Sequence, residues 1–139
     1  KPGTRLDLLL AGRPLWVRGD PEQIRRLAAD LVTCASEHVG DAGTIAVETG
    51  EGLGEAGALA RLVVRDDGRG LDAEKAARIF EPFVSSQSHR TGLMLSTVFA
   101  VVTRSGGAMA AESKPGLGTV IRLDLPLRSP PAGGNGEAA

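Results

Sequence analysis

The sequence predicts an α+β fold: a two-layer sandwich in which a mixed, mostly antiparallel sheet carries about three helices on one face. Two observations predict it. Segments with strand-like and helix-like periods follow one another as strand, helix, strand pair, helix, loop, helix and strand pair. Most strands also come in pairs that are neighbours along the chain, which is typical of antiparallel hairpins. With 139 residues, 42% of them hydrophobic, the chain is long enough for one domain with a substantial core.

The first half of the chain begins with strands and continues into a well-marked helix. Residues 4–11 and 15–18 are predicted to be two strands that flank a turn at Gly12-Arg13-Pro14. Asp20 and Pro21 are favoured at the start of a helix, as N-cap and first helical residue. The helix is predicted to run to about Val39, with one apolar stripe formed by Ile24, Leu27, Ala28, Leu31 and Ala35.

The second half is predicted to contain two strand pairs and two helices. The strands are 44–49 and 59–65, joined by a glycine-rich loop at 50–57, and then 108–112 and 119–125. Helices are predicted at 72–79 and 93–104, separated by a segment, 80–91, with the composition of a mobile loop. Residues 128–139 are rich in Pro, Gly and Ala and are predicted to be a disordered tail, so the domain is expected to be 1–127.

Composition excludes several classes of protein. The net charge is −1 and no basic run exceeds two residues, so neither a nucleic acid nor an anionic membrane is an expected partner of this domain. The single cysteine, Cys34, excludes an internal disulfide and a cysteine-based zinc site. No apolar stretch approaches a membrane span and no signal peptide is found, so the domain is expected to be cytoplasmic. Because the chain begins with Lys1, we expect it to be cut from a longer protein, which could be membrane-anchored.

The most informative stretch is the end of the predicted strand at 59–65. An apolar run is followed by Asp66 and then by Gly68 and Gly70. An ionised carboxylate only accepts hydrogen bonds, so it suits a ligand with an N–H donor, such as the amino group of adenine. The two glycines have no Cβ, which would let a flat ligand contact the backbone. The stretch is therefore predicted to bind a ligand.

Two common phosphate-binding patterns are not favoured here. The stretch from Gly68 to Ala73 formally matches the dinucleotide fingerprint G-x-G-x-x-A. A dinucleotide domain would need a parallel strand after the next helix and an acidic residue about 20 positions on. A polar loop follows instead, and no Asp or Glu lies near position 88. The P-loop pattern is absent from the sequence.

Four separated motifs together resemble a known family. They are Asp66-x-Gly68-x-Gly70, Ile79-Phe80-Glu81-Pro82-Phe83, Thr91-Gly92-Leu93-x-Leu95-Ser96 and Gly116-x-Gly118-Thr119. In this order and spacing, over about residues 16–127, the chain resembles the catalytic, ATP-binding domain of bacterial sensor histidine kinases. That domain belongs to the GHKL class shared with gyrase, heat-shock chaperones and mismatch-repair ATPases. The short loop after Phe83 resembles the nitrogen-regulator type of kinase.

The resemblance implies a role for each matching residue. Asp66 would accept the adenine amino hydrogen, Gly68 and Gly70 would shape the floor of the pocket, and Thr119 would complete it. Residues 83–92 would form a lid over ATP. The amides near Thr91, Gly92 and Leu93 would hold phosphates, because a helix N-terminus presents N–H groups and positive potential.

The resemblance also implies a reaction and partners. The γ-phosphoryl group of ATP would pass to a histidine on a separate helical dimerisation domain outside this chain, and a response regulator would be the further partner. Such transfer depends mainly on positioning and charge neutralisation, so Mg²⁺ would be a cofactor with ATP.

The chain departs from the family pattern at the metal and phosphate positions. Where the family has Asn-x-x-x-Asn, with the second Asn binding Mg²⁺, this chain has Asp30 and Cys34. Mg²⁺ prefers oxygen ligands, so Asp30 is the remaining candidate ligand and a thiol is a poor substitute. Gln87 replaces the lid lysine, and Arg90 and Met94 replace the outer glycines of the lid motif. Arg90 could pair with phosphate directly.

Simpler structural interpretations apply to several of these residues. Cys34 is expected to be a small, inert, buried helix residue, and Met94 and Phe99 are expected in the core. His38 and His89 are expected to face solvent. Asp30 could be only a polar helix residue.

Three functions stay open at this point. The first is an ATP-binding histidine kinase domain. The second is a pseudokinase with weak or lost nucleotide binding that acts in regulation or as a phosphotransfer scaffold. The third is another GHKL ATPase or a serine-directed anti-sigma kinase. An upstream helical pair with a His next to an acidic residue would exclude the third.

Overall fold

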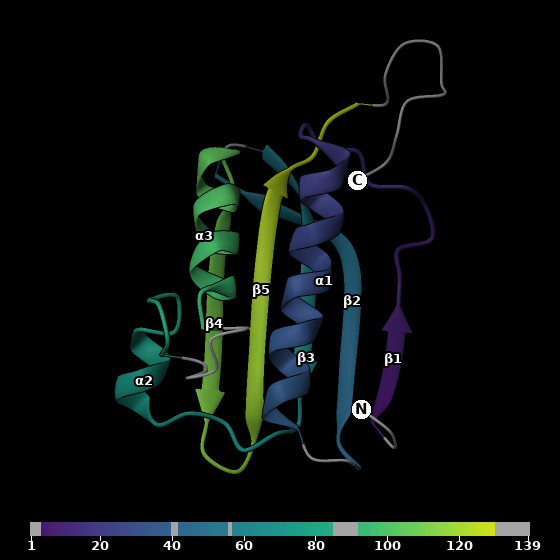
Figure 1. Ribbon diagram of the computed structural model, residues 1–139. Coiled ribbons are helices and arrows are strands. Elements are labelled where there is room, and N and C mark those ends of the chain that lie inside the picture. Colours follow the sequence, from purple (N-terminus) through teal and green to yellow (C-terminus); the bar gives the residue numbers. More distant parts are fainter. Residues whose placement is uncertain (1–3, 40–41, 56, 85–91, 130–139) are drawn as a thin grey trace.

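A mixed sheet with strand order β1-β2-β3-β5-β4 forms one layer of the computed structural model, which describes residues 4–39, 42–55, 57–84 and 92–129. Strand β1 is parallel to β2, and the other neighbouring strands are antiparallel. Helices α1 and α3 cover one face of the sheet, and α2 lies beside β4 (Figure 1). The elements are β1 (Arg5–Leu9), α1 (Pro21–His38), β2 (Thr44–Gly54), β3 (Gly57–Asp66), α2 (Ala73–Ala77), α3 (Met94–Arg104), β4 (Ala108–Lys114) and β5 (Gly118–Pro126). The predicted α+β sandwich is confirmed.

Helix α1 begins where its sequence indicates. The Asp20 carboxylate accepts a hydrogen bond from the Glu22 N–H at 2.9 Å, and Pro21 is the first helical residue. The apolar stripe of α1 packs against the sheet and against α3, which lies beside α1 on the same face. The core that results includes Leu31, Leu95, Val98 and Val102, each no more than 2% exposed.

Alternation along the strands explains why helices cover only one face. On β2 and β3, Ile45 and Val64 point toward the helices and are buried. The opposite face carries ion pairs between neighbouring strands, among them Glu48–Arg65 at 2.9 Å and Arg61–Asp124 at 2.8 Å. Charged side chains pair with one another on this face, and those of Arg65 and Glu48 are partly exposed, so the face needs no second layer.

Two local predictions were wrong. Residues 50–54 and 57 belong to the β2–β3 hairpin rather than to a loop, with Gly54 opposite Gly57. The predicted strand at 15–18 is reduced to a single bridge between Trp16 and Arg128, because no longer run of partners faces it.

The ends of the predicted domain are only partly described. Arg128 donates its N–H to the Trp16 carbonyl at 2.7 Å, so ordered structure reaches one residue beyond the predicted boundary. Residues 130–139 of the predicted tail, and 85–91 of the predicted loop, lie outside the described residues. Among the described helices, none is both long enough and apolar enough to cross a membrane.

Candidate functional site

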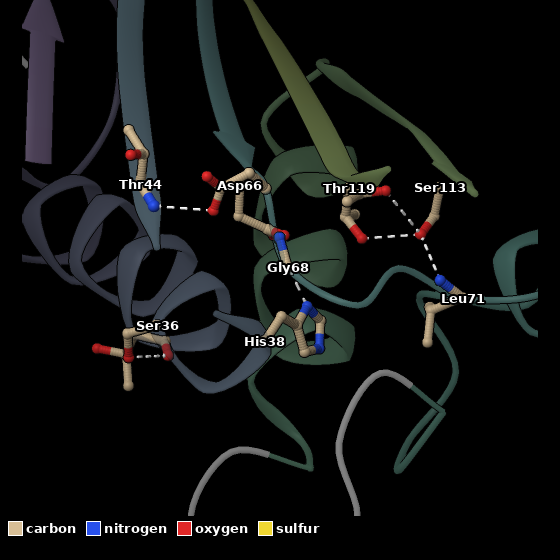
Figure 2. A network of polar contacts seen from close by, with 11 residues as sticks. Ser36, His38, Thr44, Asp66, Gly68, Leu71, Ser113 and Thr119 are labelled. Carbon is tan, nitrogen blue, oxygen red and sulfur yellow. Dashed lines mark hydrogen bonds and ion pairs between the residues drawn. The ribbon is translucent and has the colours of Figure 1, made fainter. Parts of the chain in front are cut away.

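Asp66 is the last residue of β3 and lies between Ile45 on β2 and Thr119 on β5. Its side chain is only 4% exposed. One carboxylate oxygen, Oδ1, accepts a hydrogen bond from the Gly68 N–H at 3.0 Å, which fixes the turn that follows the strand. The other oxygen, Oδ2, lies 3.7 Å from Nδ1 of His38. Figure 2 shows the two side chains meeting where the end of α1 approaches the end of β3.

The prediction that His38 faces solvent was wrong. Its side chain is 3% exposed, and its backbone carbonyl accepts a hydrogen bond from the Arg69 N–H at 3.2 Å. The helical period contained the signal, since His38 lies four residues after Cys34 and seven after Leu31, on the buried stripe.

The glycines of the turn are required by the protein's own backbone. A Cβ on Gly68 would lie 2.0 Å from the His38 carbonyl oxygen, and a Cβ on Gly70 would lie 1.9 Å from the carbonyl oxygen of Lys114. Gly70 also has a φ of 71°, which L-residues with a side chain rarely adopt. At both positions, carbonyl groups of α1 and β4 fill the space that a Cβ would take, so the glycines are required by this close packing. Their contact with a flat ligand stays a prediction.

Gly118, on the neighbouring strand β5, also has no room for a side chain. Its φ is 93°, and a Cβ there would lie 2.0 Å from the Asp66 carbonyl oxygen. Strand β5 can therefore approach the Asp66 backbone closely only with glycine at this position. This approach brings the next residue, Thr119, to the same edge of the sheet as Asp66.

Thr119 is held in a short chain of hydrogen bonds. The hydroxyl groups of Thr119 and Ser113 lie 2.8 Å apart and are hydrogen-bonded, and Ser113 Oγ also accepts from the Leu71 N–H at 2.8 Å (Figure 2). Thr119 is 2% exposed. Sequence reasoning missed Ser113, although the β4–β5 register that pairs it with Thr119 follows from the tight turn between them. The network joins the turn after β3 to the β4–β5 hairpin.

Asp67 was also missed, and it has a structural role beside Asp66. Its Oδ1 accepts a hydrogen bond from the Thr44 N–H at 2.8 Å, and its own N–H donates to the Thr44 carbonyl at 3.3 Å. The pair closes the start of β2 onto the end of β3. The two adjacent carboxylates therefore have different surroundings, and only that of Asp66 lies against α1.

Asp30 and Cys34 lie one turn apart on α1. Cys34 is buried, as predicted, and burial, together with the nearby charges of Asp30 and Glu37, raises the pKa of its thiol to about 12. The Asp30 side chain is 16% exposed and lies 4.0 Å from Nε of Arg26. Asp30 is therefore a partly buried carboxylate beside a cation, and Cys34 stays a neutral thiol at neutral pH.

This donor set does not fit a bound Mg²⁺. The ion requires several hard oxygen ligands in near-octahedral geometry, and a protonated thiol offers none. Within the described ranges, no group of three or more His, Cys, Asp or Glu side chains is arranged to hold a metal ion. Asp30 is the one oxygen donor of the predicted pair.

The predicted phosphate-binding residues are only partly described. Arg90 and Thr91 lie outside the described residues. The Gly92 carbonyl accepts a hydrogen bond from the Phe83 N–H at 2.7 Å, which closes the two ends of the predicted lid. Leu93 precedes α3, is 50% exposed and provides no side-chain cap for the first N–H groups of the helix. Met94 packs against the core, as predicted. The prediction that Phe99 lies in the core was wrong: it is 37% exposed and stacks on Phe80, with ring centroids 5.0 Å apart.

Comparison with known sequences identifies a family of ATPases. The family described as "Histidine kinase-, DNA gyrase B-, and HSP90-like ATPase" matches residues 19–129. The sensor histidine kinase ZraS of Klebsiella oxytoca is 32% identical over 114 residues, which are 80% of this chain and 23% of ZraS. The sensory histidine kinase/phosphatase NtrB of Rhodobacter capsulatus is 35% identical over 119 residues, 78% of this chain and 33% of NtrB. The chain thus spans only about a quarter to a third of these relatives.

Solved structures agree with the fold. The mycobacterial sensor histidine kinase MprB superposes with a TM-score of 0.74 at 26% identity, covering 91% of this chain and 83% of that one. The catalytic domain of the histidine kinase ThkA superposes with a TM-score of 0.75 at 24% identity, covering 89% and 79% respectively. The arrangement of sheet and helices is therefore one that these domains share.

Proposed function

Since the chain belongs to the histidine kinase-, DNA gyrase B- and HSP90-like ATPase family, we propose that it is the ATP-binding domain of a sensor histidine kinase. Its role is to present ATP so that the γ-phosphoryl group passes to a histidine on a separate helical domain of the same protein. The observation that carries this proposal is the buried Asp66 carboxylate, held beside Thr119 at one edge of the sheet. The relatives named above are sensor kinases, which favours this function over other ATPases and anti-sigma kinases of the class.

Recognition of adenine is assigned to the second oxygen of the Asp66 carboxylate, Oδ2. Oδ1 already accepts from the Gly68 N–H, so Oδ2 is the oxygen that would accept from an adenine amino group. The His38 imidazole lies against Oδ2 at 3.7 Å. Adenine therefore reaches Asp66 only if the His38 side chain rotates away from its present position.

The phosphates are assigned to the start of α3. The first N–H groups of this helix receive no side-chain cap from Leu93, so they can donate to an anion, and the helix dipole adds positive potential. By resemblance, Arg90, Thr91 and Gly92 would add contacts from the lid. Phosphate binding in this chain would then depend on backbone N–H groups and on arginine more than on a metal.

Mg²⁺ has no complete set of ligands on α1. Asp30 could contribute one carboxylate oxygen, while Cys34 is a buried neutral thiol at the position where the family pattern has an asparagine. No step of the proposed reaction is therefore assigned to a metal held by Cys34. We expect nucleotide binding to depend less on Mg²⁺ than an Asn-containing site would.

Cys34 is also the residue on which a second candidate function, that of a pseudokinase, depends. If the loss of an amide oxygen at Cys34 abolishes productive ATP binding, the domain is a pseudokinase that acts in regulation or as a phosphotransfer scaffold. Response regulators and the helical dimerisation domain are the partners in either case. The two functions differ only in whether ATP is bound and used.

Calorimetric titration of ATP and ADP, with and without Mg²⁺, tests the proposal. We expect saturable ATP binding to the natural chain and an affinity roughly tenfold or more lower in Asp66→Asn. The Asn oxygen would keep the hydrogen bond from the Gly68 N–H, so its NH₂ group, a donor, would face the adenine amino group, which is also a donor. Asp7→Asn is the matched control, since Asp7 is an exposed carboxylate on the edge strand β1. Equal affinity in both variants would overturn the role of Asp66.

The Cys34→Asn variant separates the two functions. Binding by the natural chain that Mg²⁺ barely strengthens, and strong Mg²⁺ dependence in Cys34→Asn, would support an ATP-binding kinase domain with a weakened metal site. No heat with the natural chain and recovery in Cys34→Asn would support the pseudokinase. Absence of binding in every variant, with the fold intact by circular dichroism, would reject nucleotide binding altogether.

A further inference from the structure

A cavity of about 580 Å³ lies toward the end of the sandwich away from Asp66. One wall is the N-terminal half of α1, including Ile24 and Ala28, and a second is the helix-facing side of the sheet, including Leu62 and Leu123. The third wall is the segment 10–15, which we call the strap and which joins β1 to the residues before α1. The cavity is therefore enclosed on three sides.

The walls are apolar, and their few polar groups already have partners. The Thr49 hydroxyl accepts a hydrogen bond from the Ala11 N–H at 2.8 Å, which fixes the strap to β2. Arg13 is paired with Glu51, and Arg61 is paired with Asp124. No described lining residue is acidic. A charged ligand would therefore find no unbalanced charge to pair with, and an anion would first have to displace Glu51 from Arg13.

Size and exposure indicate that the cavity is open to a small molecule. Its volume lies within the range of about 300–1,000 Å³ that is usual for sites binding small molecules. Leu10 lines the cavity and is nevertheless 59% exposed. Covering such apolar surface is favourable, because it removes the surface from water.

We propose that this cavity binds a neutral, apolar small molecule, such as a medium-length alkyl chain or a two-ring aromatic compound. The strap, whose Ala11 N–H is hydrogen-bonded to Thr49, forms one wall of a recess that opens to solvent beside Leu10. None of the lining residues contacts Asp66, Thr119 or the start of α3 in the hydrogen bonds described above. The site is thus separate from the proposed nucleotide site, and neither proposal depends on the other.

Fluorescence titration of the chain with N-phenyl-1-naphthylamine, a neutral apolar probe with a naphthyl and a phenyl group, tests the proposal. We expect saturable enhancement for the natural chain and at least about tenfold weaker binding for Ala28→Phe, whose ring would occupy the recess. Ala29→Phe is the matched control, because Ala29 is the next residue of α1 and is exposed. A second variant, Ala60→Phe, fills the same recess from β3.

Displacement of the probe by neutral and anionic competitors tests whether the cavity prefers a neutral ligand. 1-Octanol should displace the probe at concentrations roughly tenfold lower than octanoate, because the carboxylate would compete with Glu51 for Arg13. Equal displacement by octanoate would overturn the neutral character of the ligand. Unsaturable enhancement, or equal binding by the natural chain and both filled variants with their folding confirmed by thermal melts, would overturn the site itself.

Discussion

The two ends of α1 have opposite surroundings. At its C-terminal end, His38, Asp66 and the glycines of the following turn are packed so closely that carbonyl oxygens occupy the places where Cβ atoms would lie. At its N-terminal end, Ile24 and Ala28 face a hollow of about 580 Å³. One helix therefore joins a tight polar end to a loose apolar end. We expect substitutions to be strongly destabilising at the tight end and tolerated at the loose end.

The largest expected effect is at the tight end. Gly118→Ala should lower the free energy of unfolding by about 3 kcal/mol or more, since its Cβ would meet the Asp66 carbonyl oxygen at 2.0 Å. Gly116→Ala is the control: it also has a positive φ but has open space around it, so only about 1 kcal/mol of backbone strain is expected. Urea unfolding measures both changes. Similar losses of stability in the two variants would mean that the close approach of β5 to the Asp66 carbonyl does not require glycine at position 118.

Overpacking compares the two ends directly. Ala35→Phe should destabilise the protein by about 2 kcal/mol, because Ala35 is buried in the core near the tight end. Ala28→Phe, two turns earlier on the same helix, should change the unfolding free energy by less than about 0.5 kcal/mol, because the ring enters the cavity. Thermal or urea melts of the two variants provide the measurement. Equal destabilisation would show that the loose end is not hollow in solution.

A smaller effect is expected where the strap is held. Thr49→Val removes the hydroxyl that accepts the Ala11 N–H and should cost about 1 kcal/mol of stability. The exchange of the Ala11 amide hydrogen should accelerate, while amides of the core strands keep their protection. Thr33→Val on α1 is the control, since its hydroxyl bonds only within the helix. Unchanged exchange at Ala11 would mean that other contacts fix the strap.

The smallest perturbation is chemical labelling of Cys34. Because burial raises the pKa of the thiol to about 12, a maleimide or disulfide reagent should react slowly with the native chain at pH 7 to 9 and rapidly after unfolding. The thiolate forms more readily in the unfolded chain, so the stabilisation from the neutral buried thiol is present below pH 9 and is lost as the pH rises toward 12. Rapid native labelling at pH 7 would contradict the burial of Cys34.

Sequence reasoning succeeded where a local rule decides the structure. The Asp20 cap, the apolar stripe of α1 and the strand that ends at Asp66 all follow from period and capping, and the structure contains them. It failed where partners distant in sequence decide. The glycine-rich segment at 50–54 pairs as a strand because β3 lies beside it, and the predicted strand at 15–18 lacks such a partner.

The candidate site divides in the same way. The sequence by itself determined which chemical groups are present: a carboxylate after an apolar strand, glycines around it, and a thiol where an amide was expected. Only the tertiary structure decided that His38 lies against Asp66, that backbone carbonyls fill the space at the glycines and that the open cavity is elsewhere. The reason is physical. Residue type fixes charge and hydrogen-bonding capacity, whereas burial and close approach depend on the register and packing of elements far apart in the chain.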